Sequence, residues 1–141
     1  MFTEDYIIRM IEQMGEFFRE VLKLELENKF EEAHEEIDKA MKKLGISPLL
    51  VRTLPPGELM RFVTRPGGEN EDRCILLAKL LSADAHIYKT EGKNSTAHEL
   101  YKTALEILNG VSGKVEGEKL KKVQKDIEEL LISGNADNLS F

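Results

Sequence analysis

Histidine and cysteine are the side chains best suited to metal binding and to nucleophilic chemistry, and this chain has few of them. It contains three histidines, His34, His86 and His98, and one cysteine, Cys74. These residues form none of the His-x3-His, His-Glu-x-x-His or Cys-x-x-Cys spacings that zinc centres use. We therefore predict no metal site and no cofactor, and we interpret the histidines as surface residues.

Cys74 is the strongest nucleophile that the sequence offers. It falls in the first turn of a predicted helix over residues 71–91, where a helix dipole can activate a thiol. No histidine lies near it in sequence, and most carboxylates fall beside lysines on predicted outer helix faces. The glycine-rich stretch at 66–69 lacks the lysine and hydroxyl residue of a phosphate-binding loop. We predict that the protein is not an enzyme, with catalysis by Cys74 or His86 as an alternative.

One stretch of this sequence occurs twice. Ala33-His34-Glu35 reappears as Ala97-His98-Glu99, and Ala40 reappears as Ala104. Each copy follows a polar break that contains a lysine, and each ends in an apolar run. Two copies of one helical hairpin are typical of helical-repeat scaffolds, whose hairpins stack to bury a common core. Such scaffolds bind other molecules more often than they catalyse reactions.

Helical spacing of apolar residues, interrupted by Pro and Gly, predicts one all-α domain over residues 1–133 and a flexible tail over 134–141. The domain divides into four predicted segments: hairpin one at about 4–44, an irregular helical insert at about 47–70, hairpin two at about 71–109 and a terminal helix at about 118–132. We expect six or seven helices in all.

The first predicted helix carries a broad apolar face. Two stripes follow helical spacing within it, one through Phe18 and Leu22 and the other through Phe17 and Val21. A single surface contact needs only one such stripe. We therefore expect this helix to pack against two neighbours, or against one neighbour and a second subunit. The small number of hairpins favours a homodimer formed through this helix.

The second hairpin resembles a tetratricopeptide repeat. Seven positions match the spaced small and aromatic residues of that family: Leu81, Ala85, Tyr88, Gly92, Ala97, Tyr101 and Ala104. The first hairpin departs from the pattern where Val21 replaces a small residue and Asn28 replaces the turn glycine. The copies lie 64 residues apart, whereas tandem repeats of this family lie about 34 apart. The resemblance implies helical hairpins, with the insert interrupting a regular superhelix.

A second resemblance covers nearly the whole chain. A small bacterial family of unknown function, with this kind of helical fold, opens with a segment similar to YIIRMIEQM at residues 6–14. This resemblance implies the all-α fold and a bacterial source, and it offers no activity that could be assigned to the chain.

The tetratricopeptide resemblance also implies a binding surface, because the first helix of each hairpin in that family lines a concave groove. The groove candidates are then Lys79, Ser82, His86 and Lys89 in the second hairpin and Phe18 and Leu22 in the first. Two lysines beside apolar residues suit an acidic or C-terminal peptide segment. Phe18 and Leu22 have a second interpretation, as core residues beneath the insert or the last helix.

Composition narrows the classes of partner. The formal net charge of −6 disfavours binding to a phosphate backbone, so we expect no nucleic-acid partner. No apolar run approaches the ~20 residues of a membrane span, and the acidic opening at residues 1–5 is unlike a signal peptide. With one cysteine and no membrane segment, the sequence predicts a cytoplasmic protein.

The function predicted from the sequence is a non-catalytic scaffold that binds a protein or peptide, or that associates with itself. The alternative from a different class is a small-ligand-binding regulatory sensor with a cavity between helices. An enzyme that uses Cys74 or His86 is the third hypothesis.

Overall fold

Six α-helices, and no strand, make up the residues that the computed structural model describes, which are 4–63, 70–111 and 125. In chain order the helices are α1 (Glu4–Leu26), α2 (Phe30–Lys43), α3 (Pro48–Thr53), α4 (Pro56–Val63), α5 (Asn70–Thr90) and α6 (Asn94–Val111). The predicted all-α class is confirmed. The terminal helix predicted at about 118–132, the tail and the glycine-rich stretch at 66–69 lie outside the described residues.

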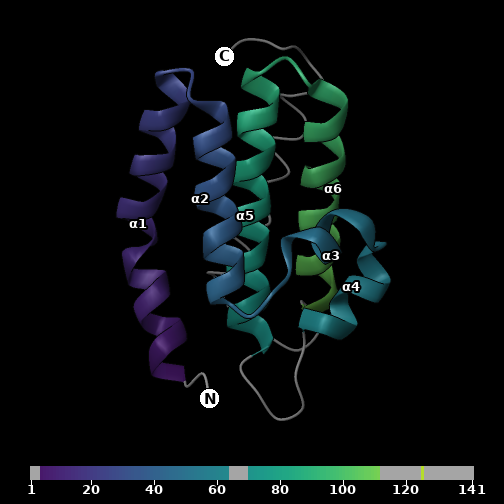
Figure 1. Ribbon diagram of the computed structural model, residues 1–141. Helices are drawn as coiled ribbons and strands as arrows, with labels where there is room; N and C mark the ends of the chain where they lie inside the picture. The colour runs from purple at the N-terminus through teal and green to yellow at the C-terminus, as the bar shows by residue number, and fades with distance from the viewer. Residues whose placement is uncertain (1–3, 64–69, 112–124, 126–141) are drawn as a thin grey trace.

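Helices α1 and α2 form one hairpin, and α5 and α6 form another (Figure 1). The turns of the two hairpins have the same type of backbone geometry. Asn28 in the first turn has φ 61°, and Gly92 in the second has φ 89°. The following residue donates its N–H back into the helix in each case, from Lys29 to Leu24 O and from Lys93 to Tyr88 O, both at 2.8 Å. This is the Schellman ending of a helix, for which glycine and asparagine adopt the positive φ at the lowest cost.

The insert begins where α2 is stopped abruptly. Gly45 has φ 80°, and the N–H of Ile46 donates to Met41 O at 3.0 Å, so a glycine ends the helix. The hydroxyl of Ser47 then accepts a hydrogen bond from the Leu50 N–H at 3.4 Å, with Pro48 in the first turn of α3. Helix α3 packs back against α2, and α4 packs against α5 and α6.

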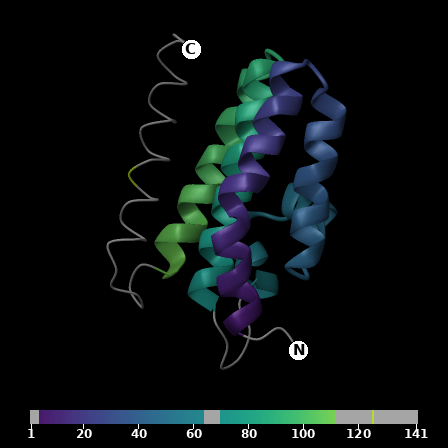
Figure 2. The same ribbon diagram turned by 90° about the vertical axis from the view of Figure 1, so that its left-hand side faces the viewer.

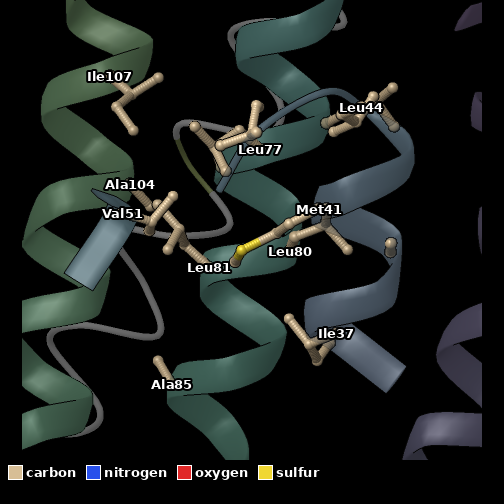
Figure 3. Packing of buried hydrophobic residues seen from close by; sticks show 14 of the residues in the cluster. Ile37, Met41, Leu44, Val51, Leu77, Leu80, Leu81, Ala85, Ala104 and Ile107 are labelled. Carbon is tan, nitrogen blue, oxygen red and sulfur yellow. The ribbon is translucent and has the colours of Figure 1, made fainter. Parts of the chain in front are cut away.

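Helix α5 is the central helix of the bundle. It packs most extensively against α6, and it also contacts α1, α2 and α4. Figure 3 shows Leu77 and Leu80 of α5 between Met41 of α2 and Ile107 of α6. A helix with so many neighbours has to be apolar around most of its circumference. Accordingly, every residue from 74 to 78 is apolar and buried, as are Leu80 and Leu81.

Small residues allow the paired helices to approach each other. Ala33 and Ala97 are 0% and 2% exposed, and the second repeated pair, Ala40 and Ala104, is also buried. The repeated alanines therefore face the core in both hairpins. Within residues 4–63 and 70–111, no helix has both the length and the apolar composition needed to cross a membrane.

Candidate functional site

The residues predicted for a groove fall on two helices that touch each other. Helices α1 and α5 are in contact, so the α1 candidates and the α5 candidates occupy neighbouring helices. The four α5 side chains are all half-buried: Lys79, Ser82, His86 and Lys89. The hydroxyl of Ser82 donates to Ala78 O at 2.9 Å within its own helix, whereas His86 reaches across to α1. That these residues line a binding groove stays a prediction.

Helix α1 presents an exposed apolar surface. Leu22 and Leu26 lie one turn apart and are 45% and 76% exposed, and Phe18, one turn earlier, is half-buried against the core. We call Phe18, Leu22 and Leu26 the α1 stripe. Figure 2 shows α1 at an edge of the bundle, with α2 to one side and α5 and α6 behind it. Leu22 is therefore exposed and Phe18 partly buried, and Leu26 was not among the predicted residues.

The first polar contact between the hairpins joins α1 to α5. His86 Nδ1 lies 2.7 Å from Glu25 Oε2, and the Thr90 hydroxyl donates to the same carboxylate oxygen. Glu25 is only 5% exposed. Burial raises the pKa of Glu25, but the hydrogen bonds from His86 and Thr90 outweigh burial, so this pKa lies below the ordinary value of 4.5. Glu25 is therefore held as a buried carboxylate with donors from α5.

The second polar contact joins α2 to α5 through His34. Its Nδ1 lies 2.5 Å from Asp84 Oδ1, and its Nε2 lies 2.6 Å from Glu91 Oε2. Asp84 is 1% exposed, and the ring of Tyr88 lies against the imidazole at a centroid distance of 4.2 Å. The interpretation of His34 as a surface residue is therefore wrong. Both of its ring nitrogens contact carboxylates of the other hairpin, one on α5 and one in the turn after it.

The two carboxylates that contact His34 also have cationic neighbours. The Arg52 guanidinium of α3 lies 2.6 Å from Asp38 Oδ1 and 3.6 Å from Asp84 Oδ2. At the other carboxylate, Lys93 Nζ lies 3.5 Å from Glu91 Oε1. The cluster therefore ties α2, α3 and α5 together with alternating charges, which compensates for the burial of Asp84.

The charge of His34 follows from this geometry. Burial lowers the pKa of His34, but hydrogen bonding to Asp84 and Glu91, together with their negative charges, outweighs burial and holds this pKa above the ordinary value of 6.5. A carboxylate oxygen accepts and does not donate, so two carboxylates are satisfied by one imidazole only when both ring nitrogens carry protons. The arrangement is thus an imidazolium clamp and leaves no ring nitrogen available as a general base.

One residue of the sequence, Asp84, could have indicated this cluster, although it is not part of the repeated stretch. Asp84 interrupts an apolar run on a helix that is otherwise buried, and a carboxylate in that position requires a partner. Its partner His34 lies 50 positions away in the chain, and Glu91 lies 57 positions from His34. Local spacing could therefore predict that Asp84 has a partner, but could not identify it.

The side chains considered for catalysis do not assemble an active site in the part of the chain that is described. The thiol of Cys74 is buried, at 0% exposure, within the core. Among residues 4–63 and 70–111, no group of three or more His, Cys, Asp or Glu side chains is arranged to hold a metal ion. A buried thiol without an approach for a substrate behaves as a small core residue.

A polar groove lies between α1 and α2. It has a volume of about 680 Å³ and is lined by five glutamates, three lysines and Leu24. A second groove of about 590 Å³ shares Glu20, Lys23 and Glu36 with the first and extends along α1 to Phe17. Pockets for small ligands are predominantly apolar with a few placed polar groups, and these charged walls differ from that description.

Comparison of the chain with protein-family models, with curated proteins and with solved structures finds no match. The resemblances to tetratricopeptide repeats and to a small bacterial family therefore stay predictions.

Proposed function

We propose that this protein is a non-catalytic helical scaffold whose α1 stripe is covered by another protein chain, and that the covering chain is a second copy of itself. The observation that carries the proposal is the exposure of Leu22 and Leu26 on successive turns of one helix. Two large aliphatic side chains adjacent on an edge helix form a patch, whereas a scattered exposed leucine needs no explanation. Burying them against a partner stabilises the associated state by removing apolar surface from water.

A second copy is the occupant that best suits a stripe of this shape. The exposed side chains follow a single helical seam, and a seam of that kind pairs readily with another helix. Helix α1 is 23 residues in length, which is long enough for an extended helix pair. Two-fold association buries the same patch on both copies, which is the commonest form of protein self-association.

The side chains considered for catalysis support a non-catalytic role. Both ring nitrogens of His34 are occupied, Cys74 is fully buried, and His86 is paired with Glu25. The polar surroundings of α5 also suit contact with a protein surface better than the chemistry of a small substrate. The lysines Lys79 and Lys89 would lie beside an apolar seam, an arrangement that favours an acidic segment as any further partner.

The test is the oligomeric state of the full chain, measured by sedimentation equilibrium. The double variant Leu22→Glu, Leu26→Glu places two charges in the seam, and Leu49→Glu is the matched control because Leu49 is 68% exposed on α3. We expect the wild type and the control to be dimers at about 100 µM and the double variant to be a monomer, because a buried unpaired carboxylate opposes association. Circular dichroism checks that the double variant keeps its helices.

Two outcomes would contradict self-association through this helix. One is a wild-type monomer at that concentration. The other is a double variant that remains helical and dimeric, which would place the interface elsewhere.

A complementary experiment is available because Cys74 is buried. Leu26→Cys adds an accessible thiol to the α1 stripe, and we expect this variant to form a disulfide-linked dimer under mild oxidation.

A further inference from the structure

The two hairpins meet through α5, and the ion pairs that join them include one histidine on each side. On one side His86 of α5 contacts Glu25 of α1, and on the other His34 of α2 contacts Asp84 of α5 and Glu91 in the turn after α5. Each of these carboxylates belongs to the opposite hairpin from its histidine. Arg73 of α5 also donates to the backbone carbonyl of Leu44 at the end of α2, and this contact does not depend on a histidine. The charged part of hairpin–hairpin docking therefore includes His34, a group whose charge can change near neutral pH.

His34 occupies the more demanding position of the two. Its two nitrogens lie 2.5 and 2.6 Å from oxygens of Asp84 and Glu91, so each carboxylate requires a ring N–H. A neutral imidazole has one N–H and one lone pair. Loss of a proton would place that lone pair against a carboxylate oxygen, which turns one attractive contact into a repulsive one.

We propose that the docking of the α1–α2 hairpin on the α5–α6 hairpin is controlled by a proton on His34: the imidazolium binds Asp84 of α5 and Glu91 of the following turn together, and docking weakens when one ring proton leaves. The inference concerns the two hairpins of a single chain, and it does not depend on whether the α1 stripe binds a partner. A scaffold built in this way would change the relation between its two hairpins with pH.

The surrounding charges favour weakening of this contact over unfolding of the whole bundle. The titratable and charged groups around His34 are Asp84, Tyr88 and His86 on α5, Glu25 on α1, Asp38 on α2, Arg52 on α3, and Glu91 and Lys93 in the turn after α5. Arg52 lies 3.6 Å from Asp84, and Lys93 lies 3.5 Å from Glu91. Both carboxylates therefore retain a neighbouring cation when His34 is neutral, while α2 loses one of the two hydrogen bonds that His34 makes.

The direction of the pH effect follows from the shift of each group. Because the pKa of His34 is raised in the folded protein, its stabilisation is complete below the ordinary value of 6.5 and is lost as the pH rises through the raised pKa. Glu25 acts in the opposite sense: its pKa is lowered, so its stabilisation is present above 4.5 and is lost as the pH falls through the lowered pKa. Docking is therefore strongest in the window between the two transitions.

The first test needs no substitution. Nitrogen-15 NMR of the histidine rings in the full-length wild type follows both nitrogens of His34 as the pH is raised. We expect both to carry protons at pH 6.5 and the midpoint of the transition to lie above that value, which is the ordinary one for histidine. A ring with a single proton at pH 6.5, or a midpoint below it, would overturn the proposal. In that case a proton on a carboxylate would explain the short contacts.

The second test measures docking itself by backbone hydrogen exchange, corrected for the intrinsic effect of pH. We expect the protection of α2 to fall as the pH rises from about 6 to about 9, because the raised pKa of His34 couples loss of its proton to weaker docking. Protection of α6 should change much less.

His34→Gln is the variant that removes the proton, and His98→Gln is its matched control at the repeated position. We expect His34→Gln to start with low protection of α2 and to show no further fall with pH, while His98→Gln behaves as the wild type does. An equal fall of α2 protection in the wild type and in His34→Gln would contradict control of docking by His34. No fall of α2 protection in the wild type would contradict it as well. If His34→Gln does not fold, the ring titration of the wild type still decides the question.

Discussion

The two hairpins of this protein share a repeated sequence, and they differ in the residues that pack against them. Their turns have the same backbone conformation: Asn28 and Gly92 have positive φ, and the lysine after each one donates its N–H back into the preceding helix. His34 and His98 also occupy the repeated position. His34 contacts Asp84 of α5 and Glu91 in the turn after α5, because α5 packs against α2.

The acids show the same contrast. Glu27 and Glu91 are repeated positions, and each lies near the lysine two residues later, at 3.4 and 3.5 Å. The side chain of Glu27 is 44% exposed, whereas that of Glu91 is 16% exposed and also contacts His34. A repeated sequence therefore reproduces local geometry, while the energetic role of each side chain depends on the neighbouring hairpin.

The largest expected effect tests whether the hairpins share one core. Leu44 and Leu108 are repeated positions, and both are 0% exposed. We expect Leu44→Ala and Leu108→Ala each to lower the free energy of unfolding by about 2–5 kcal/mol, because each leaves a cavity in the core. Urea unfolding measures both values. A loss below about 1 kcal/mol for Leu44→Ala alone would mean that the first hairpin is a separate, weakly attached unit.

The turns provide the next largest effect. Gly92→Ala should destabilise by about 1–2 kcal/mol, because a Cβ makes the left-handed conformation unfavourable. Asn28→Ala should cost less, about 0.5–1 kcal/mol, since asparagine already bears part of that strain. Thermal unfolding of both variants checks the order. A larger loss at Asn28 would show that its side chain has a role that the repeated glycine cannot have.

The buried carboxylate of α1 should show a pH-dependent effect of about 1 kcal/mol. Glu25→Gln removes the charge that accepts from His86 and Thr90, so the wild type should be the more stable protein above the ordinary carboxyl pKa of 4.5. The difference should shrink as the pH falls through the lowered pKa of Glu25. Urea titrations at several pH values measure it, with exposed Glu20→Gln as the control. A difference that does not vary with pH would contradict an ionic role for Glu25.

The smallest effect distinguishes the two repeated lysines. Lys93 lies 5.7 Å from the centre of the Tyr88 ring and also contacts the half-buried Glu91, so Lys93→Ala should cost about 0.5–1 kcal/mol. Lys29→Ala removes an ion pair whose two side chains are exposed and should cost less than about 0.5 kcal/mol. Equal losses at these two positions, measured by urea unfolding, would argue against a specific role for the Tyr88 contact.

Sequence reasoning succeeded where short-range effects dominate. Gly45 and Gly92 end helices because a residue with positive φ completes the last turn, and Ser47 begins one because its hydroxyl accepts a backbone N–H. The repeated alanines were correctly predicted as buried, since helices in close contact exclude larger side chains. Helical spacing also marked the broad apolar face of α1 that contains Leu22.

The candidate site was predicted only in outline. Phe18, Leu22 and His86 do lie on neighbouring helices, but the charged groups that matter most, Glu25 and Asp84, were not among the predicted site residues. Their importance comes from burial and from partners on the opposite hairpin. A helix wheel gives the face on which a residue lies, and it contains no information on which distant helix will cover that face.

The amino-acid sequence by itself determined the helices, their capped ends and the pairing of each helix with its immediate neighbour, because these depend on residues a few positions apart. The stacking of one hairpin on the other was decided only in the tertiary structure. That stacking turned His34 into a clamp on Asp84 and Glu91, 50 and 57 positions away, since the charge state of a buried group depends on which partners three-dimensional packing brings within hydrogen-bonding distance.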